Sequence, residues 1–333
     1  MGKEKGCFDG LDVAAMVAHL ERELIGRRII NIYDGVSEND SFLIKFDGEN
    51  KQVLVLESGI RFHTTQHASS LQAESMPSPF TSKLRKHLRG LRLERIMQLG
   101  NYDRVVNFVF GSGENRCSLI LELYARGNLI MTSAKYEILA LLRSHEYEKD
   151  DVHVQVGRVY PVTYATSIGQ VGEGLLTKTG QECIEWCKSE MKHKDDASEE
   201  LTSNNNKKKD SVVPLKAFLL KPSSGVYQYG PSLIEHCILL AKIDPNIKIS
   251  PQTLDTALTV KEWEQLVTVL KTEGKKVMES LKNNDVTGHI LYRPRESTGH
   301  HEASDTLPHS NKVLQDFVPH ILLQHAGRLC IDY

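Results

Sequence analysis

The sequence has 333 residues, 40% of them hydrophobic and 25% charged, which is ordinary for a globular protein and long enough for two domains. Its net charge of -2 excludes a protein that is basic throughout, so an anionic partner would have to meet a local basic patch. No apolar run reaches the roughly 18 to 20 residues of a membrane span, the N-terminus lacks the apolar core of a signal peptide, and the cysteines are scattered as in a reduced protein. We therefore expect a soluble protein with no membrane partner, located in the cytoplasm or in both cytoplasm and nucleus.

Residues 1–170 are predicted to form a sheet-rich α+β domain. Residues 9–24 place apolar side chains at helical spacing, with Asp9 and Asp12 near the start, where acids suit the free N–H groups of a helix. Three alternating segments that end in turn residues, "RRIINIYDG", "SFLIKFDG" and "KQVLVLES", predict antiparallel strands. We expect a polar loop at 64–79, a helix over 81–89 that stops at Gly90, and then a meander of about five strands.

The second half of the sequence has a different character. Residues 171–213 fade from a helical pattern into a polar tract, which predicts a linker without stable structure. Residues 214–284 predict a small helical unit, in which Pro231 after Gly230 starts one helix. Residues 285–333 return to a strand pattern around a second polar insert at 296–311. The strand-like end "RLCIDY" indicates a piece of a longer protein.

A cluster of basic residues lies on the predicted helix at 81–89 and just beyond it. Arg and Lys beside a stripe of apolar anchors suit the binding of a phosphate backbone. A solvated helix face is the plainer interpretation of such a charge run. The local excess of positive charge, against a net charge of -2, keeps both interpretations open. The candidate residues are Lys83, Arg85, Lys86, Arg89 and Arg92.

Asp103 and Arg104 stand at the start of a predicted strand and form the second candidate feature. Adjacent residues on a strand point to opposite faces, so these two cannot simply pair with each other. One of them could contact a ligand while the other is held from within. A turn-capping Asp beside a solvated Arg is the plainer interpretation.

No motif for catalysis or cofactor binding is present. The sequence has no G-x-S-x-G, no phosphate-binding P-loop and no G-x-G-x-x-G. Cys183 and Cys187, taken with His193, lack a second ligand pair at metal spacing and do not predict a zinc site. We expect no catalytic residue, no metal and no cofactor, and hence a binding protein rather than an enzyme.

Several segments taken together resemble one family. They include "FDGLDVAAMVAHLERELIGRRIINIYD", "LVLESGIRFHTT", "PSPFTSKLRKHLRGLRLERIMQLGNYDRVVNFVFGSGE" and "LILELYARGNLIMT". These segments resemble the NFACT-N domain region of ribosome-quality-control factors, a family that includes NEMF, ribosome quality control complex subunit 2 and the RqcH or FbpA-like proteins. "YGPSLIEHCILLAKIDPNIKI" resembles that family's helix-hairpin-helix segment.

The resemblance implies a fold related to the N-terminal domain of formamidopyrimidine-DNA glycosylases, with a helix-hairpin-helix-like unit inserted. It implies binding to tRNA, both peptidyl-tRNA and aminoacyl-tRNA, and to a stalled large ribosomal subunit. It also implies template-free tailing of the nascent chain and its ubiquitination by a Listerin-type E3 ligase, through regions that we expect outside this sequence. The residues it implies for tRNA handling are Asp12, Asp103 and Arg104. Asp9 is held in reserve because "FDGLD" can be aligned in two ways.

Two departures from the family pattern limit what the resemblance implies. The start "MGKEKG" lacks the proline or amine nucleophile of a glycosylase, and "PSSGVYQYGPS" lacks the plain hairpin of a DNA-binding helix-hairpin-helix. The inserted unit is therefore expected to act as a spacer rather than a nucleic-acid clamp. Two alternatives stay open: a nucleic-acid-processing enzyme of glycosylase-like fold with Asp103 as general acid or base, and a protein-only scaffold.

Overall fold

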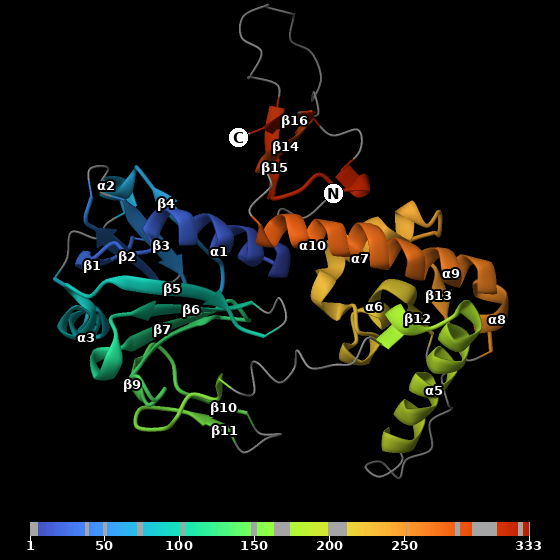
Figure 1. Ribbon diagram of the computed structural model, residues 1–333, viewed down its shortest axis with the longest axis horizontal. Coiled ribbons are helices and arrows are strands. Elements are labelled where there is room, and N and C mark those ends of the chain that lie inside the picture. The colour runs from blue at the N-terminus through green and yellow to red at the C-terminus, as the bar shows by residue number, and fades with distance from the viewer. Residues whose placement is uncertain are drawn as a thin grey trace, which may run out of the picture. The chain divides into compact units, whose positions relative to one another are not determined.

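The structure is a computed structural model that divides into two compact units (Figure 1). Unit 1 comprises residues 1–170 with 281–285, and unit 2 comprises residues 171–280 with 286–333. The residues described are 6–36, 40–48, 52–71, 76–100, 104–147, 152–162, 174–198, 212–250, 252–283, 287–294, 312–325 and 329–332. Within these ranges no helix is both long and apolar enough to cross a membrane.

Unit 1 is built from two antiparallel sheets and two main helices. Helix α1 (Gly10–Leu24) precedes a sheet of β1 (Ile29–Asp34), β2 (Ser41–Phe46), β3 (Val53–Glu57) and β4 (Arg61–Thr65), in that order. The short α2 (Ala68–Leu71) and then α3 (Pro79–Leu88) precede a sheet of β5 (Leu93–Gln98), β6 (Val105–Phe110), β7 (Cys117–Glu122), β8 (Asn128–Thr132) and β9 (Ile138–Leu141). A separate hairpin pairs β10 (His145–Tyr147) with β11 (Val152–Val154).

The predicted helices, the three strands and the five-stranded meander are confirmed. The loop expected at 64–79 differs, because β4 continues through Thr65 and α2 occupies 68–71. Strand β4 was not predicted because its sequence, "RFHTT", buries only Phe62 and so shows little apolar alternation. The sheet-rich first unit and the helical second unit confirm the α+β class.

The two sheets face a common core to which both helices contribute. Fully buried side chains include Leu20 and Leu24 of α1, Leu84 and Leu88 of α3, and Phe108 of β6. A second, smaller cluster includes Ile120, Ile130 and Tyr160. Because β7 is buried along its whole length, the side chains on both of its faces contribute to a core.

The two halves of unit 1 repeat the same backbone at a spacing of 64 residues. Helix α1 ends at Leu24 and is followed by Gly26 at φ +86°, while α3 ends at Leu88 and is followed by Gly90 at φ +82°. Both glycines adopt left-handed conformations that favour glycine after a helix. The first strand after each helix then carries a bulge at the matching place, Ile29 to Asn31 in one half and Leu93 to Arg95 in the other.

The helix of each repeat packs mainly against the first strand of the other half. Helix α1 packs against β5 and also against β4 of its own half, and α3 packs against β1 and also against β9 (Figure 1). The last residue of β1 is hydrogen-bonded to the start of α3, and the last residue of β5 is hydrogen-bonded to the start of α1. Asp34 accepts hydrogen bonds from the N-cap Ser78 (2.8 Å) and from Thr81 (2.6 Å), while Gln98 donates to the carbonyl of Gly10 (3.0 Å). Unit 1 is thus a pseudo-twofold pair within one chain.

Unit 2 contains a helical part and a three-stranded sheet. Its helices are α5 (Gly180–Ser198), α6 (Leu215–Leu219), α7 (Gly230–Leu240), α8 (Leu254–Ala257), α9 (Val260–Val269) and α10 (Lys275–Lys282), with a short ladder between β12 (Val213–Pro214) and β13 (Lys248–Ile249). Strand β14 (His289–Pro294) lies between β15 (Lys312–Val318) and β16 (Leu329–Asp332). One turn of π-helix joins α9 to α10 at Leu270–Gly274.

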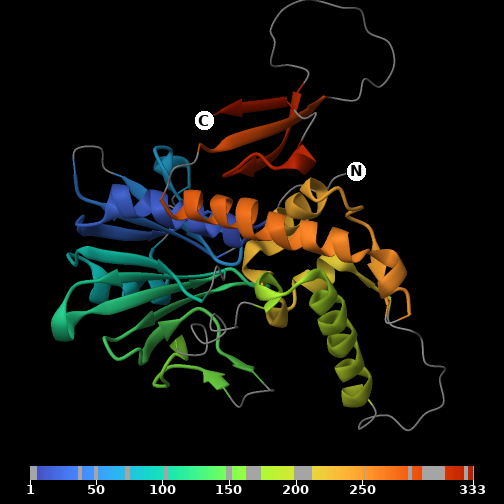
Figure 2. The same cartoon turned by 45° about the vertical axis from the view of Figure 1, so that its right-hand side comes forward.

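Helix α5 lies inside the segment 171–213 that was expected to be a linker. Its buried residues, Cys183, Ile184, Cys187 and Met191, form one stripe at helical spacing, and this face packs against α9 (Figure 2). Lysines and acidic residues surround that stripe, so the apolar periodicity of this segment is weak in the sequence. Residues 199–211 of the same segment lie outside the described residues.

The π-helical turn is explained by Tyr229. The Tyr229 hydroxyl donates to the carbonyl of Leu270 at 3.0 Å, so a side chain competes for a carbonyl that would otherwise accept only from the helix backbone. A Cβ atom on Gly274 would lie 2.5 Å from the Tyr229 ring, so glycine is needed where the ring enters. Between α6 and α7 the chain forms two short 3₁₀ turns, Pro222–Ser224 and Tyr227–Tyr229.

Candidate nucleic-acid interface

Arg104 lies directly before β6 and is held from three sides. Its carbonyl accepts a hydrogen bond from the amide of Leu123 at 2.9 Å. Its guanidinium carbon lies 4.7 Å from the centre of the Tyr124 ring, a cation–π contact, and its Nη1 lies 3.9 Å from Sγ of Cys7. Arg104 therefore has a defined place beside the β7–β8 turn and beside the segment that enters α1.

Asp12 and Asp9 cap the N-terminus of α1 together. Asp9 is the N-cap residue, and its Oδ1 accepts from the amides of Leu11 (2.9 Å) and Asp12 (3.1 Å). Asp12 Oδ2 accepts from the amide of Asp9 at 2.8 Å, which completes a capping box. The expected role of acids at this helix start is confirmed. Each carboxylate bonds the other's backbone, so both acids serve the helix cap, and the choice between them as the functional acid stays a prediction.

The structure places Arg104 beside the segment that leads into the helix of Asp12. Cys7, which contacts Arg104, lies two residues before the N-cap of the helix that carries Asp12. Asp12 is buried and Arg104 is half-buried. Asp103 lies outside the described residues.

The basic residues of α3 are used in two different ways. Lys83, Lys86 and Arg89 are exposed. Arg85 is instead half-buried, with its Nε donating to the carbonyl of Ile32 at 2.6 Å and its guanidinium 5.4 Å from the centre of the Tyr33 ring. Arg85 thus fastens α3 to β1. In this Arg85 differs from Lys83, Lys86 and Arg89, and its RNA-backbone role stays a prediction.

Arg92 does not continue the helix face, because α3 ends at Leu88 and Arg89 is its C-cap. Arg92 forms an isolated antiparallel bridge with Arg28, where β1 and β5 begin. Nη1 of Arg28 donates to the carbonyl of Gly90 at 2.9 Å, beside the end of α3. Arg28 and Arg92 lie in different halves of unit 1, and no local sequence pattern indicates their pairing. We define the basic face as Lys83, Lys86 and Arg89 together with Arg28 and Arg92.

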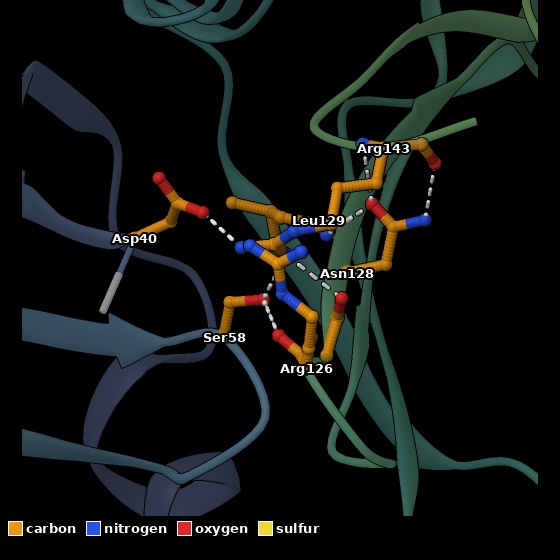
Figure 3. A network of polar contacts seen from close by, with 7 residues as sticks. Asp40, Ser58, Arg126, Asn128, Leu129 and Arg143 are labelled. Atoms are coloured by element: carbon orange, nitrogen blue, oxygen red, sulfur yellow. Dashed lines mark hydrogen bonds and ion pairs between the residues drawn. The ribbon is translucent and has the colours of Figure 1, made fainter. Parts of the chain in front are cut away.

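A polar network holds the turn between β7 and β8, which carries Tyr124 (Figure 3). Arg143 donates through Nη1 to the hydroxyl of Ser58 (3.1 Å) and to the carbonyl of Gly127 (2.8 Å), and it forms an ion pair with Asp40 through Nη2. The side chain of Asn128 bonds both the carbonyl (2.8 Å) and the amide (3.2 Å) of Arg143. This network joins the β3–β4 turn to the β7–β8 turn.

Two glycines allow these turns to meet. Gly59 and Gly127 have φ of +77° and +68°, and a Cβ on Gly127 would lie 1.9 Å from the amide nitrogen of Gly59. No other residue type fits this contact without moving the backbone. The sequence predicted neither the contact nor the roles of Arg143 and Tyr124. Its only sign was the pair of motifs "ESG" and "ARGN", which occupy matching turns in the two halves.

No arrangement for metal binding is seen in the described part of the chain. No three His, Cys, Asp or Glu residues there lie close enough together to hold an ion. The described thiols of Cys7, Cys117, Cys183, Cys187 and Cys237 are free, and burial raises the pKa of Cys183 to about 11 and that of Cys237 to about 12. Such thiols stay protonated near neutral pH and are poor nucleophiles.

The chain is similar to known proteins of one family. The family described as NFACT N-terminal and middle domains matches residues 9–165. The chain is 33% identical over 330 residues to the human ribosome quality control complex subunit NEMF, covering 99% of this chain and 27% of that protein. It is 30% identical over 352 residues to ribosome quality control complex subunit 2 of Schizosaccharomyces pombe, covering 98% of this chain and 32% of that protein. The chain thus spans about a third or less of the length of these relatives.

A solved structure shows the same fold over nearly the whole chain. It is the fibrinogen binding protein from Staphylococcus aureus, with a TM-score of 0.54, 19% identity, and coverage of 98% of this chain and 94% of that chain. At this identity the likeness shows the fold alone. The expected relation to the glycosylase N-terminal fold stays a prediction.

Proposed function

Because the chain belongs to the NFACT family, whose members include the ribosome quality control subunits, we propose that it is the N-terminal part of a ribosome-quality-control factor. In this proposal it binds tRNA and the stalled large ribosomal subunit, and it supports tailing of the nascent chain and ubiquitination by a Listerin-type ligase. It works in the cytoplasm, with access to the nucleus. It is not itself an enzyme, because the ribosome makes the peptide bonds.

The basic face is the observation that carries the RNA-binding part of the proposal. Lys83, Lys86 and Arg89 are exposed, and none takes part in an ion pair among the described residues. Lys86 lies in the last turn of α3 and Arg89 is its C-cap, where positive charge is favoured by the helix dipole. A concentration of uncompensated charge on a protein of net charge -2 suits contacts with a phosphate backbone.

The two candidate features divide the work of recognition. The basic face supplies affinity that does not depend on sequence, since phosphate contacts position a nucleic acid without reading it. Arg104 supplies selectivity, since a guanidinium held on an aromatic ring can donate to a base edge or a phosphate. Asp12 supports the same corner through the N-terminus of α1.

The test is tRNA binding by the purified chain across a salt series. The variants are Lys86→Ala/Arg89→Ala and Arg104→Ala, and the control is Lys275→Ala/Lys276→Ala, which removes the same charge from exposed positions of unit 2. We expect the first double variant to flatten the dependence of log K on log salt by about 1.5 units, at roughly 0.7 to 0.9 per contact. Arg104→Ala should lose preference for tRNA over other RNA. The control should behave as wild type.

Three outcomes contradict the proposal. If wild type binds no tRNA, or all variants bind alike, the basic face is only a solvated surface and a protein-only scaffold is favoured. If the chain cleaves nucleic acid, the enzyme alternative is favoured. Asp12 should be tested as Asp12→Asn, because the amide oxygen can still accept from the amide of Asp9 and preserve the cap, whereas Asp12→Ala would also break the capping box.

A further inference from the structure

Tyr124 is unusual among the surface residues of unit 1. Among the described residues of that unit, it is the one exposed aromatic side chain in a set that is otherwise aliphatic or Met, and 36% of its surface is open. Its chain neighbour Leu123 is fully buried. The Tyr124 ring is partly exposed to solvent, with a guanidinium 4.7 Å from its centre, so part of a flat apolar surface lies outside the core.

The turn that carries Tyr124 is fixed by contacts on all sides. The amide of Gly127 donates to the carbonyl of Tyr124 at 2.5 Å, which closes the turn, and Ala125 sits at φ +46° within it. Gly127 then meets Gly59 backbone to backbone, and Arg143 ties both turns together (Figure 3). A non-glycine residue in the left-handed region is strained and persists because its surroundings determine it.

The position of Arg104 is fixed with the same precision. Its carbonyl is bonded to Leu123, so the residue before Tyr124 sets the strand position of the arginine. The ring and the guanidinium are therefore presented together before any ligand arrives. A surface that is ordered in advance loses less entropy on binding than a flexible one.

We propose that Tyr124 and Arg104 form one stacking platform for an unpaired nucleobase of RNA. The base packs on the part of the Tyr124 ring that the guanidinium leaves open, beside Arg104. Arg104 then donates hydrogen bonds to the base edge or to the flanking phosphate, because its N–H groups lie in the plane of the guanidinium. Phosphate binding alone would need charge but no exposed ring, and the basic face already offers charge. This inference rests on the proposed function and deepens it.

The experiment compares two RNA probes with the full chain at fixed salt. One probe is tRNA, which has unpaired bases in its loops and 3′ end, and the other is a blunt RNA duplex without unpaired bases. The variants are Tyr124→Phe, which keeps the ring, and Tyr124→Leu, which keeps apolar bulk without it. Arg104→Lys keeps the charge without the planar guanidinium. Thermal melting of each variant checks that the fold is intact.

We expect Tyr124→Phe to bind tRNA as wild type does. Tyr124→Leu and Arg104→Lys should lose about tenfold in tRNA affinity, the usual scale for one stacked base, with duplex binding unchanged. The salt slope of Tyr124→Leu should equal that of wild type, since no phosphate contact is removed.

The possible failures are distinguishable. If Tyr124→Leu binds tRNA as tightly as wild type while Arg104→Ala is impaired, the platform is overturned and the proposed function stands. If Tyr124→Leu loses tRNA and duplex binding equally and melts at a lower temperature, the ring is structural and the platform is also overturned. If wild type binds neither probe, both proposals fail.

Discussion

Gly59 and Gly127 meet backbone to backbone where two turns of unit 1 join, and this contact is possible because neither residue has a Cβ atom. The left-handed φ of Gly127 would cost an alanine about 1–2 kcal/mol in any setting. Its surroundings add a clash with the amide of Gly59, which no rotamer change can relieve because the neighbour is backbone.

Gly127→Ala is therefore expected to destabilise the protein by at least about 3 kcal/mol. Gly113→Ala is the matched control, because Gly113 has a similar φ of +60° but no atom within 4 Å of the added Cβ, and it should cost only about 1–2 kcal/mol. The measurement is urea unfolding followed by circular dichroism. Equal losses in the two variants would show that the close contact contributes nothing.

At the same scale, the sequence predicted local roles, such as helix capping, better than it predicted hydrogen-bond partners that lie far apart in the chain. Acids at the start of α1 were predictable because capping is local, within three residues. The role of Arg85 was not predictable, because its acceptor on Ile32 is 53 positions away in the sequence. Nothing in a run of basic residues distinguishes the arginine that is tied to a carbonyl from those that face water.

At the scale of elements, two imidazoles hold the segment that follows β15. His236 of α7 accepts through Nδ1 from the amide of Leu323 at 2.9 Å, and His325 accepts through Nδ1 from Leu322 at 3.1 Å. Burial, with a smaller effect of His320, lowers the pKa of His236, while Glu273 opposes this shift. A protonated Nδ1 could no longer accept, so the contact requires the neutral ring.

The sign of the pH dependence follows from that shift. The unfolded chain binds a proton at His236 near pH 6.5, while the folded chain binds it only at lower pH, so stability is full above pH 6.5 and declines as pH falls through the folded pKa. For one proton the slope is at most about 1.4 kcal/mol per pH unit. Burial and the neighbouring charges of His289 and Lys276 lower the pKa of His320 as well, which adds in the same direction.

The measurement uses the two tryptophans, Trp186 and Trp263, which both lie in unit 2, so that their fluorescence reports on that unit. We expect the urea midpoint to fall between pH 6.5 and 5 in wild type. His236→Asn, whose amide oxygen can accept from Leu323, should show a smaller fall. An unchanged pH profile in His236→Asn would mean that another group carries the dependence.

Elements with a strong pattern were predictable and those with a mixed pattern were not. The meander from β5 to β9 consists of short, largely apolar segments separated by turn residues, and its five strands were predicted. Helix α5 was missed in part because its buried stripe is surrounded by Lys and acidic residues. For the candidate site, a family resemblance indicated Asp12 and Arg104, but a turn position such as Tyr124 carries no pattern of its own.

At the scale of the whole molecule, the two helices make each half of unit 1 depend on the other. Helix α3 packs against β1 of the first half, α1 packs against β5 of the second, and side chains of both halves share one core. A cut between residues 71 and 76 separates the halves without dividing a helix or strand that the structure describes. We expect neither fragment, 1–71 or 76–165, to fold alone, because each would expose the apolar face that the other covers.

Coexpressed fragments should reassemble into a soluble complex. The check is copurification through a tag on one fragment, followed by circular dichroism of the complex against each fragment alone. A fragment that folds cooperatively by itself would contradict the mutual dependence of the halves.

The repeat also places two unlike side chains at one backbone position. Asp40 and Arg104 are 64 residues apart, and each offers its carbonyl to the matching turn, to Ser58 at 3.0 Å and to Leu123 at 2.9 Å. In the first half the side chain closes the fold through Arg143, while in the second it faces an exposed ring. The first copy of the corner joins two turns through its side chain, and the second copy places its side chain against a ring at the surface. One duplicated corner thus has two different uses in the same chain.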